Sequence, residues 1–119
     1  MKQRKAGGRI LVVEDELTVA MCIEDILVQA GYVVVGPVGR LEKALEAVSN
    51  EQLDVALLDM NLKGKSIYPV ARILADRGIP FAFLSGYGAD VLPADIKAPL
   101  LPKPFDVNEL LATLDTLLV

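Results

Sequence analysis

Short apolar runs alternate along the chain with stretches in which apolar residues recur every three or four positions. The short runs are typical of buried β-strands, and the longer spacing predicts amphipathic helices. The predicted strands span residues 10–13, 32–35, 55–58, 81–84 and 100–101. The predicted helices span residues 19–30, 41–48, 67–74 and 107–118. Gly31 and Gly78 should end two of these helices, and Asp106 with Glu109 should cap the start of the last one.

The alternation of strands and helices predicts a single α/β domain. Right-handed crossovers between successive strands give a parallel sheet with helices on both faces. Strands covered on both faces should be apolar throughout, as these runs are. The 119 residues are enough for one such domain with a good core. We therefore expect a doubly wound sheet of five parallel strands.

Two segments interrupt this regular pattern. Gly36-Pro37 should end the second strand, because proline cannot donate to a sheet ladder. The stretch between the fourth and fifth strands, residues 86–99, contains Gly88 and Pro93 and is too broken for a full helix. We expect a shortened fourth helix there, about one turn near residues 89–92.

Charge and hydropathy argue against several classes of function. No apolar run approaches the roughly 18 residues of a membrane-spanning helix, so we expect no membrane insertion. Residues 1–8 are basic, and we expect them to form a flexible arm before a domain spanning residues 9–119. The whole chain carries a net charge of −4, which opposes direct binding to nucleic acid.

Cysteine and histidine usage narrows the chemistry. Cys22 is the only cysteine, so no intramolecular disulfide can form and a reducing, cytoplasmic location fits. Its helical spacing with Val19, Ile23 and Ile26 predicts an inert hydrophobic residue of the apolar face rather than a reactive thiol. The chain has no histidine, so any metal ion should have oxygen ligands, as magnesium and calcium do.

Polar residues follow four of the five predicted strands. Glu14-Asp15 follows the first, Asp59 the third, Ser85-Gly86 the fourth and Lys103-Pro104 the fifth. A buried strand gains nothing from an unpaired charge, whose burial is costly. In open parallel sheets the ligand crevice lies beyond the carboxyl ends of the strands. The four strand ends therefore predict one site at that edge.

Each of these residues also has an ordinary structural explanation. Glu14-Asp15 would suit the start of a helix, Asp59 and Ser85 would suit turns, and Lys103 would suit a solvated surface. We favour the site because the structural explanation needs four independent coincidences.

With these residues in this order, the chain resembles the receiver domains of two-component response regulators. The resemblance covers nearly all of the chain, from about Arg9 to Val119, and includes Lys103-Pro104-Phe105. It implies a CheY-like, flavodoxin-like fold with strand order 2-1-3-4-5. It also implies a phosphorylation-controlled signalling protein that catalyses its own phosphorylation and dephosphorylation and is not a conventional enzyme.

The resemblance implies a nucleophile and a metal site. Asp59 would accept a phosphoryl group and form an aspartyl phosphate. Mg²⁺ would be held by Asp15, Asp59 and the backbone carbonyl of Asn61, with Glu14 acting through water.

The same resemblance implies the groups that contact the phosphoryl oxygens. Lys103 would supply a compact positive charge, and the Ser85 hydroxyl and the Gly86 amide would donate hydrogen bonds. The peptide bond between Lys103 and Pro104 would be cis, which would help to aim the lysine into the site.

Two features depart from the usual receiver pattern. Leu100 stands where many receivers carry the aromatic residue that reports phosphorylation. Residues 80–87 resemble the Pro-Phe-x-Phe-Ala-Thr-Gly-Tyr motif of a single-domain subgroup, with Leu84 and Ser85 in place of Ala and Thr. That subgroup lacks the aromatic switch and often works with stress-related kinases. We therefore expect the signal to be carried by an order change in residues 86–98.

Asn61 and Tyr87 lie two residues beyond Asp59 and Ser85, so both should flank the phosphoryl group. We expect them to control access of water and to set the lifetime of the phosphorylated form. The implied phosphoryl donor is a sensor histidine kinase or a histidine phosphotransfer protein. Output would run through contact with a downstream protein partner, unless the chain serves as a phosphate sink.

Three other functions share part of this pattern. A haloacid-dehalogenase-like phosphatase would use Asp59, but it needs a second acid where Asn61 stands. A flavodoxin-like cofactor carrier needs a phosphate loop rich in Ser, Thr and Gly where residues 14–16 are acidic. A degenerate receiver that binds partners without phosphorylation is the closest rival, and the complete set of site residues argues against it.

Overall fold

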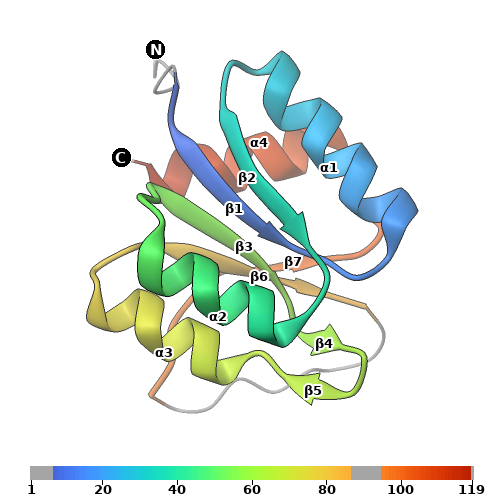
Figure 1. Ribbon diagram of the computed structural model, residues 1–119. Helices are drawn as coiled ribbons and strands as arrows, with labels where there is room; N and C mark the ends of the chain where they lie inside the picture. The colour runs from blue at the N-terminus through green and yellow to red at the C-terminus, as the bar shows by residue number, and fades with distance from the viewer. Residues whose placement is uncertain (1–6, 87–94, 119) are drawn as a thin grey trace.

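The computed structural model describes residues 7–86 and 95–118, and its centre is a five-stranded parallel sheet (Figure 1). The sheet contains β1 (Arg9–Val13), β2 (Val33–Val38), β3 (Val55–Asp59), β6 (Phe81–Ser85) and β7 (Leu100–Pro102). The strand order is β2-β1-β3-β6-β7, and every neighbouring pair is parallel. The expected doubly wound sheet with order 2-1-3-4-5 is confirmed.

Helices cover both faces of this sheet. One face carries α1 (Leu17–Gln29) and α4 (Val107–Leu117), and the other carries α2 (Leu41–Asn50) and α3 (Tyr68–Asp76) (Figure 1). Each face has its own apolar core, and β1, β3 and β6 contribute alternate residues to the two cores. This arrangement explains why these strands are apolar throughout. It also gives the residues at their ends a rigid support.

Local sequence signals set several helix ends. Asp106 and Glu109 form the expected capping box of α4: Glu109 N donates to Asp106 Oδ1 at 2.8 Å, and Asp106 N donates to Glu109 Oε1 at 3.0 Å. Gly31 and Gly78 follow α1 and α3 with φ angles of +93° and +71°. These left-handed conformations favour glycine at helix ends.

The prediction that Gly36-Pro37 ends the second strand is wrong, because β2 continues to Val38. β2 is an edge strand, and its register with β1 shifts between Leu11 and Val13. The Gly36–Pro37 peptide bond is cis. One side of an edge strand has no partner strand, and the ladder with β1 is irregular at this point. A residue without an N–H group can therefore be tolerated here.

A small hairpin follows β3 that the sequence pattern does not indicate. β4 (Asn61–Leu62) and β5 (Lys65–Ser66) are antiparallel and are joined by the two-residue turn Lys63-Gly64. The φ angles of Lys63 and Gly64 are +52° and +77°. The tightest hairpin turns require positive φ at both central positions.

The predicted place of Cys22 in the apolar face is also wrong, since this residue is exposed, while the inertness of its thiol stays a prediction. The buried residues of α1 are Ala20, Ile23 and Leu27. Cys22 falls just outside this stripe because the helix turns by 3.6 residues per turn.

Several predictions concern residues that lie outside, or next to the limits of, the described ranges. The helical turn near residues 89–92, the placement of Tyr87 and the first six residues of the arm lie outside the described residues. Gly7 N donates to Gly31 O, and Gly8 O accepts from Val33 N, so the described end of the arm is joined to the sheet domain. Within residues 7–86 and 95–118, no helix is long and apolar enough to span a membrane.

Candidate functional site

Three parallel strands bring buried polar residues to the same edge of the sheet. Glu14 directly follows β1, and Asp59 and Ser85 are the last residues of β3 and β6. Their exposed fractions are 3%, 5% and 3%, in a described chain whose other buried side chains are apolar. Glu14 N donates to Val38 O, and Lys103 N donates to Ser85 O. These backbone bonds fix the points from which the side chains extend.

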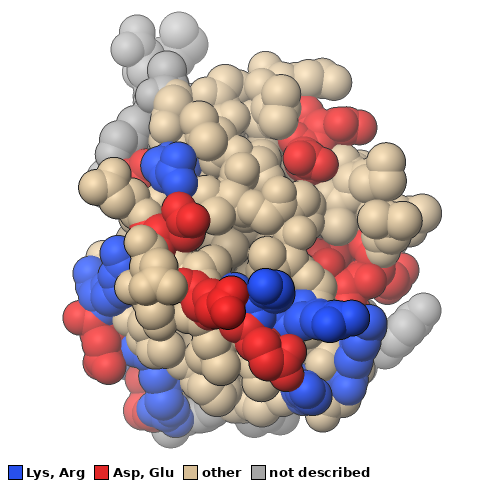
Figure 2. All heavy atoms as spheres, viewed as in Figure 1, with Lys and Arg blue, Asp and Glu red and all other residues tan. Residues whose placement is uncertain are grey.

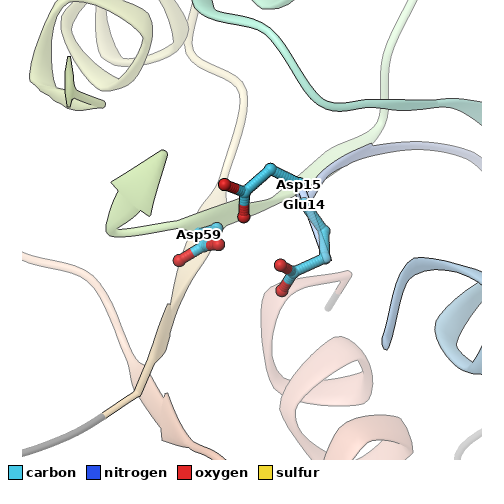
Figure 3. A group of neighbouring side chains, drawn as sticks. All are labelled: Glu14, Asp15 and Asp59. Atoms are coloured by element: carbon cyan, nitrogen blue, oxygen red, sulfur yellow. The ribbon is translucent and has the colours of Figure 1, made fainter. Parts of the chain in front are cut away.

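Three carboxylates meet at this edge (Figure 3). One oxygen each of Glu14, Asp15 and Asp59 lies within 4.8 Å of the other two. Glu14 Oε2 accepts a hydrogen bond from Glu16 N at 3.0 Å. Like charges at this separation disfavour one another's ionised forms unless a cation balances them. The cluster therefore favours a positive charge among its oxygens.

Lys103 supplies part of that positive charge. Its Nζ lies 2.6 Å from Glu14 Oε1 and 3.6 Å from Asp59 Oδ2. The contact with Glu14 is a close ion pair rather than a well-aligned hydrogen bond. Desolvation lowers the pKa of Lys103, but the neighbouring Glu14 and Asp59 carboxylates outweigh it and raise that pKa above its usual value. The ammonium therefore stays charged at neutral pH.

Asp59 has an unusual electrostatic environment. Desolvation by burial and the neighbouring Glu14 carboxylate raise the pKa of Asp59 from 3.8 to about 7. Asn61 N donates to Asp59 Oδ1 at 3.0 Å, and this bond, with the charge of Lys103, offsets part of the rise. Ionising Asp59 next to other carboxylates costs free energy, and an added cation would reduce this cost by stabilising the ionised form.

The donor set fits Mg²⁺. Hard divalent cations prefer carboxylate and carbonyl oxygens, and the cluster offers three carboxylates against the single ammonium of Lys103. Glu14 Oε1 is fully buried and has no aligned hydrogen bond, and the charge that faces it is the Lys103 ammonium, so the cluster already holds one cation at this oxygen. The histidine-free sequence offers no imidazole ligand for a softer metal.

A pocket of about 330 Å³ opens over the cluster. It is lined by Asp15, Glu16, Asp59, Asn61, Lys63, Gly86 and Lys103. Five of the predicted site residues therefore share one cavity. Glu14 does not line it and is buried against Lys103. The geometry combines acidic oxygens, a lysine and a backbone amide around a space that suits a small anion with a metal ion.

The comparison with known proteins agrees with this geometry. The model of the response regulator receiver domain family matches residues 10–115. The chain belongs to this family. Receiver domains take part in two-component signalling and are in general not conventional enzymes.

Solved receiver structures are similar along nearly the whole chain. SdrG from Sphingomonas melonis Fr1 is 39% identical with a TM-score of 0.85, and the match covers 98% of this chain and all of SdrG. The receiver domain of the sensor histidine kinase PA1611 from Pseudomonas aeruginosa PAO1 is 27% identical with a TM-score of 0.79, over 95% of this chain and 98% of that chain. The crystal structure of the PA1611 domain contains a magnesium ion coordinated in its active site cleft.

A curated relative is longer than this chain. The transcriptional regulatory protein PdtaR of Mycobacterium tuberculosis is 24% identical over 112 residues, which is 90% of this chain. The match covers 55% of PdtaR, so the receiver chain spans about half the length of that relative.

The structure also places the other predicted residues of this receiver domain, of which Gly86 lines the pocket and Ser85, Leu100 and Pro104 do not. Ser85 is buried at the end of β6, and Gly86 follows it on the pocket wall. The Lys103–Pro104 peptide bond is cis. Leu100, at the position of the usual aromatic switch, is 41% exposed and pairs with Phe83 across β6 and β7.

Two residues of the receiver pocket were missed by sequence reasoning. Glu16 is the third acid after β1 and lines the pocket beside Asp15. Lys63 lines it from the turn of the β4–β5 hairpin. The available signal for Lys63 was the Lys-Gly pair shortly after a strand, which is a poor turn signature because lysine rarely adopts positive φ.

Proposed function

We propose that the protein is a phosphoryl-accepting receiver in which Asp59 is phosphorylated by a histidine kinase or a histidine phosphotransfer protein. The observation that carries the proposal is the nearly buried Asp59 carboxylate, which lies in a cluster of acids with Lys103 3.6 Å away. A strongly shifted pKa at an acidic residue that lines a pocket is typical of a functional group rather than a structural one.

In the proposed step, Asp59 Oδ2 attacks the phosphorus atom of the donor's phosphohistidine. A P–O bond forms, the P–N bond breaks, and the electron pair returns to the imidazole nitrogen. Asn61 N holds the other oxygen, Oδ1, at 3.0 Å and orients the carboxylate. Positioning and charge neutralisation supply most of the catalysis in such transfers.

Asp15, Asp59 and the Asn61 carbonyl would hold Mg²⁺, with Glu14 acting through water. When bound, the ion would neutralise charge on the transferring phosphoryl group. Support comes from the three-carboxylate cluster and from the magnesium ion in the similar PA1611 receiver domain.

Lys103, Ser85 and Gly86 would contact the phosphoryl oxygens. Lys103 is charged and already oriented by Glu14, 2.6 Å away. The Ser85 hydroxyl lies at the end of β6 and the Gly86 amide directly follows it, and β6 is the strand between Asp59 on β3 and Lys103 after β7. Charge-assisted contacts of this kind stabilise the transferred group most effectively when their geometry is set in advance.

We also propose that Asn61 and Tyr87 set the lifetime of the aspartyl phosphate by limiting the approach of water. Tyr87→Ala should then change the rate of dephosphorylation in a purified assay, and an unchanged rate would contradict this role. Output would run through residues 86–98 to a downstream protein partner, since Leu100 cannot serve as the aromatic switch.

The central test uses acetyl phosphate and Mg²⁺ as the phosphoryl source. Intact-mass analysis should detect one acid-labile phosphoryl group on the wild-type protein and none on Asp59→Asn. Beryllofluoride, a phosphoryl mimic, should shift the NMR spectrum of the wild type but not that of the variant. Absence of both effects in the wild type would favour a degenerate receiver, and rapid turnover of phosphate esters would favour a phosphatase.

A further inference from the structure

The pocket contains a second lysine that the catalytic scheme above does not use. Lys63 lies in the turn of the β4–β5 hairpin and lines the same pocket as Asp59 and Lys103. Basic side chains gather over this hairpin in Figure 2. Lys65, two residues further on, is paired with Glu42 at 3.1 Å. Lys63 forms no ion pair with any residue that the structure describes.

The backbone of Lys63 is unfavourable for a lysine. Among the described residues, it is the non-glycine residue with a positive φ, +52°. Turns of this kind favour Asn, Asp or Gly at their first central position. A left-handed conformation costs other residues roughly 1–2 kcal/mol. The turn itself therefore does not explain why lysine stands here, whereas a use for its charge would.

The balance of charge around the pocket provides such a use. The residues at this pocket carry two ammonium groups, of Lys63 and Lys103, and four carboxylates, those of Glu14, Asp15, Glu16 and Asp59, with Asp59 counted in the ionised form that a bound cation would favour. One divalent cation cancels the remaining two negative charges. Without Lys63, the loaded site would keep a net negative charge and would repel an incoming phosphoryl dianion. Charges on the walls of so small a pocket lie within the roughly 10 Å screening length at 0.1 M salt.

We propose that Lys63 is a second positive charge for the phosphoryl group, which draws the anion into the pocket and favours the phosphorylated form of Asp59. Lys103 is fixed by Glu14 at the inner end of the site, whereas Lys63 reaches the pocket from the hairpin turn. This inference rests on the proposed function and adds an anion-binding role for the hairpin.

The test compares Lys63→Gln and Lys63→Asn with the matched control Lys65→Gln. Lys65 belongs to the same hairpin and carries the same charge, but it does not line the pocket. Asparagine suits the left-handed turn, so the Asn variant removes the charge without harming the turn. Each protein is titrated with beryllofluoride in saturating Mg²⁺, and separately with Mg²⁺ alone, with NMR shifts as the readout.

Both Lys63 variants should bind beryllofluoride about three- to tenfold more weakly at low ionic strength, as expected for one lost charge in a partly solvated site. The difference should shrink near 1 M salt, where the screening length is about 3 Å. Mg²⁺ alone should bind both variants more tightly than the wild type, because a competing cation is gone. Lys65→Gln should match the wild type with both ligands.

The opposite signs for the anion and the cation separate lost charge from damaged structure. Weaker binding of both ligands, or a defect in Lys63→Gln that Lys63→Asn repairs, would overturn the role of the Lys63 charge. Equal beryllofluoride affinity in all four proteins would overturn it too, while leaving the proposed function intact. If the wild-type protein binds no beryllofluoride, both the proposed function and this inference are contradicted.

Discussion

The two ends of the parallel sheet differ in how their charged side chains are paired and buried. At the amino end, Arg9 N donates to Asp54 Oδ2 at 2.7 Å, while the Arg9 side chain contacts Gln52 O at 2.7 Å and Glu51 Oε2 at 3.0 Å. The ion pair is solvated, with Arg9 and Glu51 side chains 37% and 47% exposed. At the carboxyl end, three carboxylates lie close to one another, Lys103 contacts two of them, and Glu14 and Asp59 are almost fully buried.

The amino end also satisfies its helix ends from within the chain. Arg77 Nη1 donates to Val48 O at 2.6 Å and to Glu51 O at 3.0 Å, which caps the carbonyls at the end of α2. The charged side chains of Arg9, Asp54 and Arg77 thus have partners within the chain. The carboxyl end is left with excess negative charge that only a bound cation can balance. Incomplete pairing of charges, rather than charge as such, therefore distinguishes the functional end of this sheet.

The largest expected effect comes from removing the ammonium at the carboxyl end. Lys103→Met should slow phosphorylation by acetyl phosphate by about 10²- to 10³-fold, the cost of losing one preorganised group that stabilises developing charge. Arg9→Met removes a cation from the amino end and should leave the rate within twofold. Phosphorylation rates from intact-mass time courses check both. Equal effects of the two substitutions would erase the contrast between the ends.

The next effect is a pH dependence of stability in metal-free protein. Because the pKa of Asp59 is raised from 3.8 to about 7, the folded state keeps a proton between about pH 4 and pH 7 that the unfolded state has released. The contribution of Asp59 to stability is therefore present at low pH and is lost as pH rises to 7, by on the order of 3 kcal/mol. Urea unfolding in EDTA at several pH values measures this slope.

Two controls sharpen the pH experiment. Asp59→Asn should flatten the slope over the same range, since the amide does not titrate. Adding Mg²⁺ at pH 7 should restore stability to the wild type by binding only the folded state. A wild type and an Asp59→Asn variant with parallel profiles would show that the Asp59 carboxyl titrates normally.

A smaller effect is expected for the internal cap at the amino end. Arg77→Met removes both hydrogen bonds to the carbonyls of Val48 and Glu51, at a cost of about 1–2 kcal/mol. The loss should be independent of pH between 5 and 8, and Mg²⁺ should not repair it. Urea unfolding with and without Mg²⁺ gives the measurement, and a loss that Mg²⁺ reverses would link this end to the site after all.

The smallest effect concerns the solvated ion pair. Glu51→Gln should cost about 0.5 kcal/mol and even less in high salt, because exposed pairs are screened and contribute little. Thermal or urea unfolding at two salt concentrations tests this. A cost above about 2 kcal/mol would mean that the amino end also depends on a strong electrostatic contact.

Much of the carboxyl end could be predicted from the sequence because parallel strands align their ends. Once β1, β3, β6 and β7 are assigned from their apolar runs, Glu14, Asp59, Ser85 and Lys103 must lie on one edge. The pairing of Glu14 with Lys103 at 2.6 Å could not be predicted in the same way. It depends on side-chain geometry that periodicity does not contain.

The missed features share a physical cause, which is that they are too local or too irregular for a periodic signal. The β4–β5 hairpin has two residues in each strand and a lysine in its turn, so neither alternation nor turn composition reveals it. β2 passes through Gly36-Pro37 only because it lies at the edge of the sheet, and edge position is a property of the whole fold. Cys22 differs from its buried neighbours on α1 by a fraction of a helical turn.

Proline also has a consequence for how the protein behaves in concentrated solution. The two outer strands of the sheet each contain one, Pro37 in β2 and Pro102 in β7. Unbroken rows of backbone donors on edge strands promote aggregation, because a strand from another molecule can pair with them. The prolines interrupt such a row at both edges of this sheet. The prolines thereby hinder the extension of the sheet from one molecule to the next into polymers.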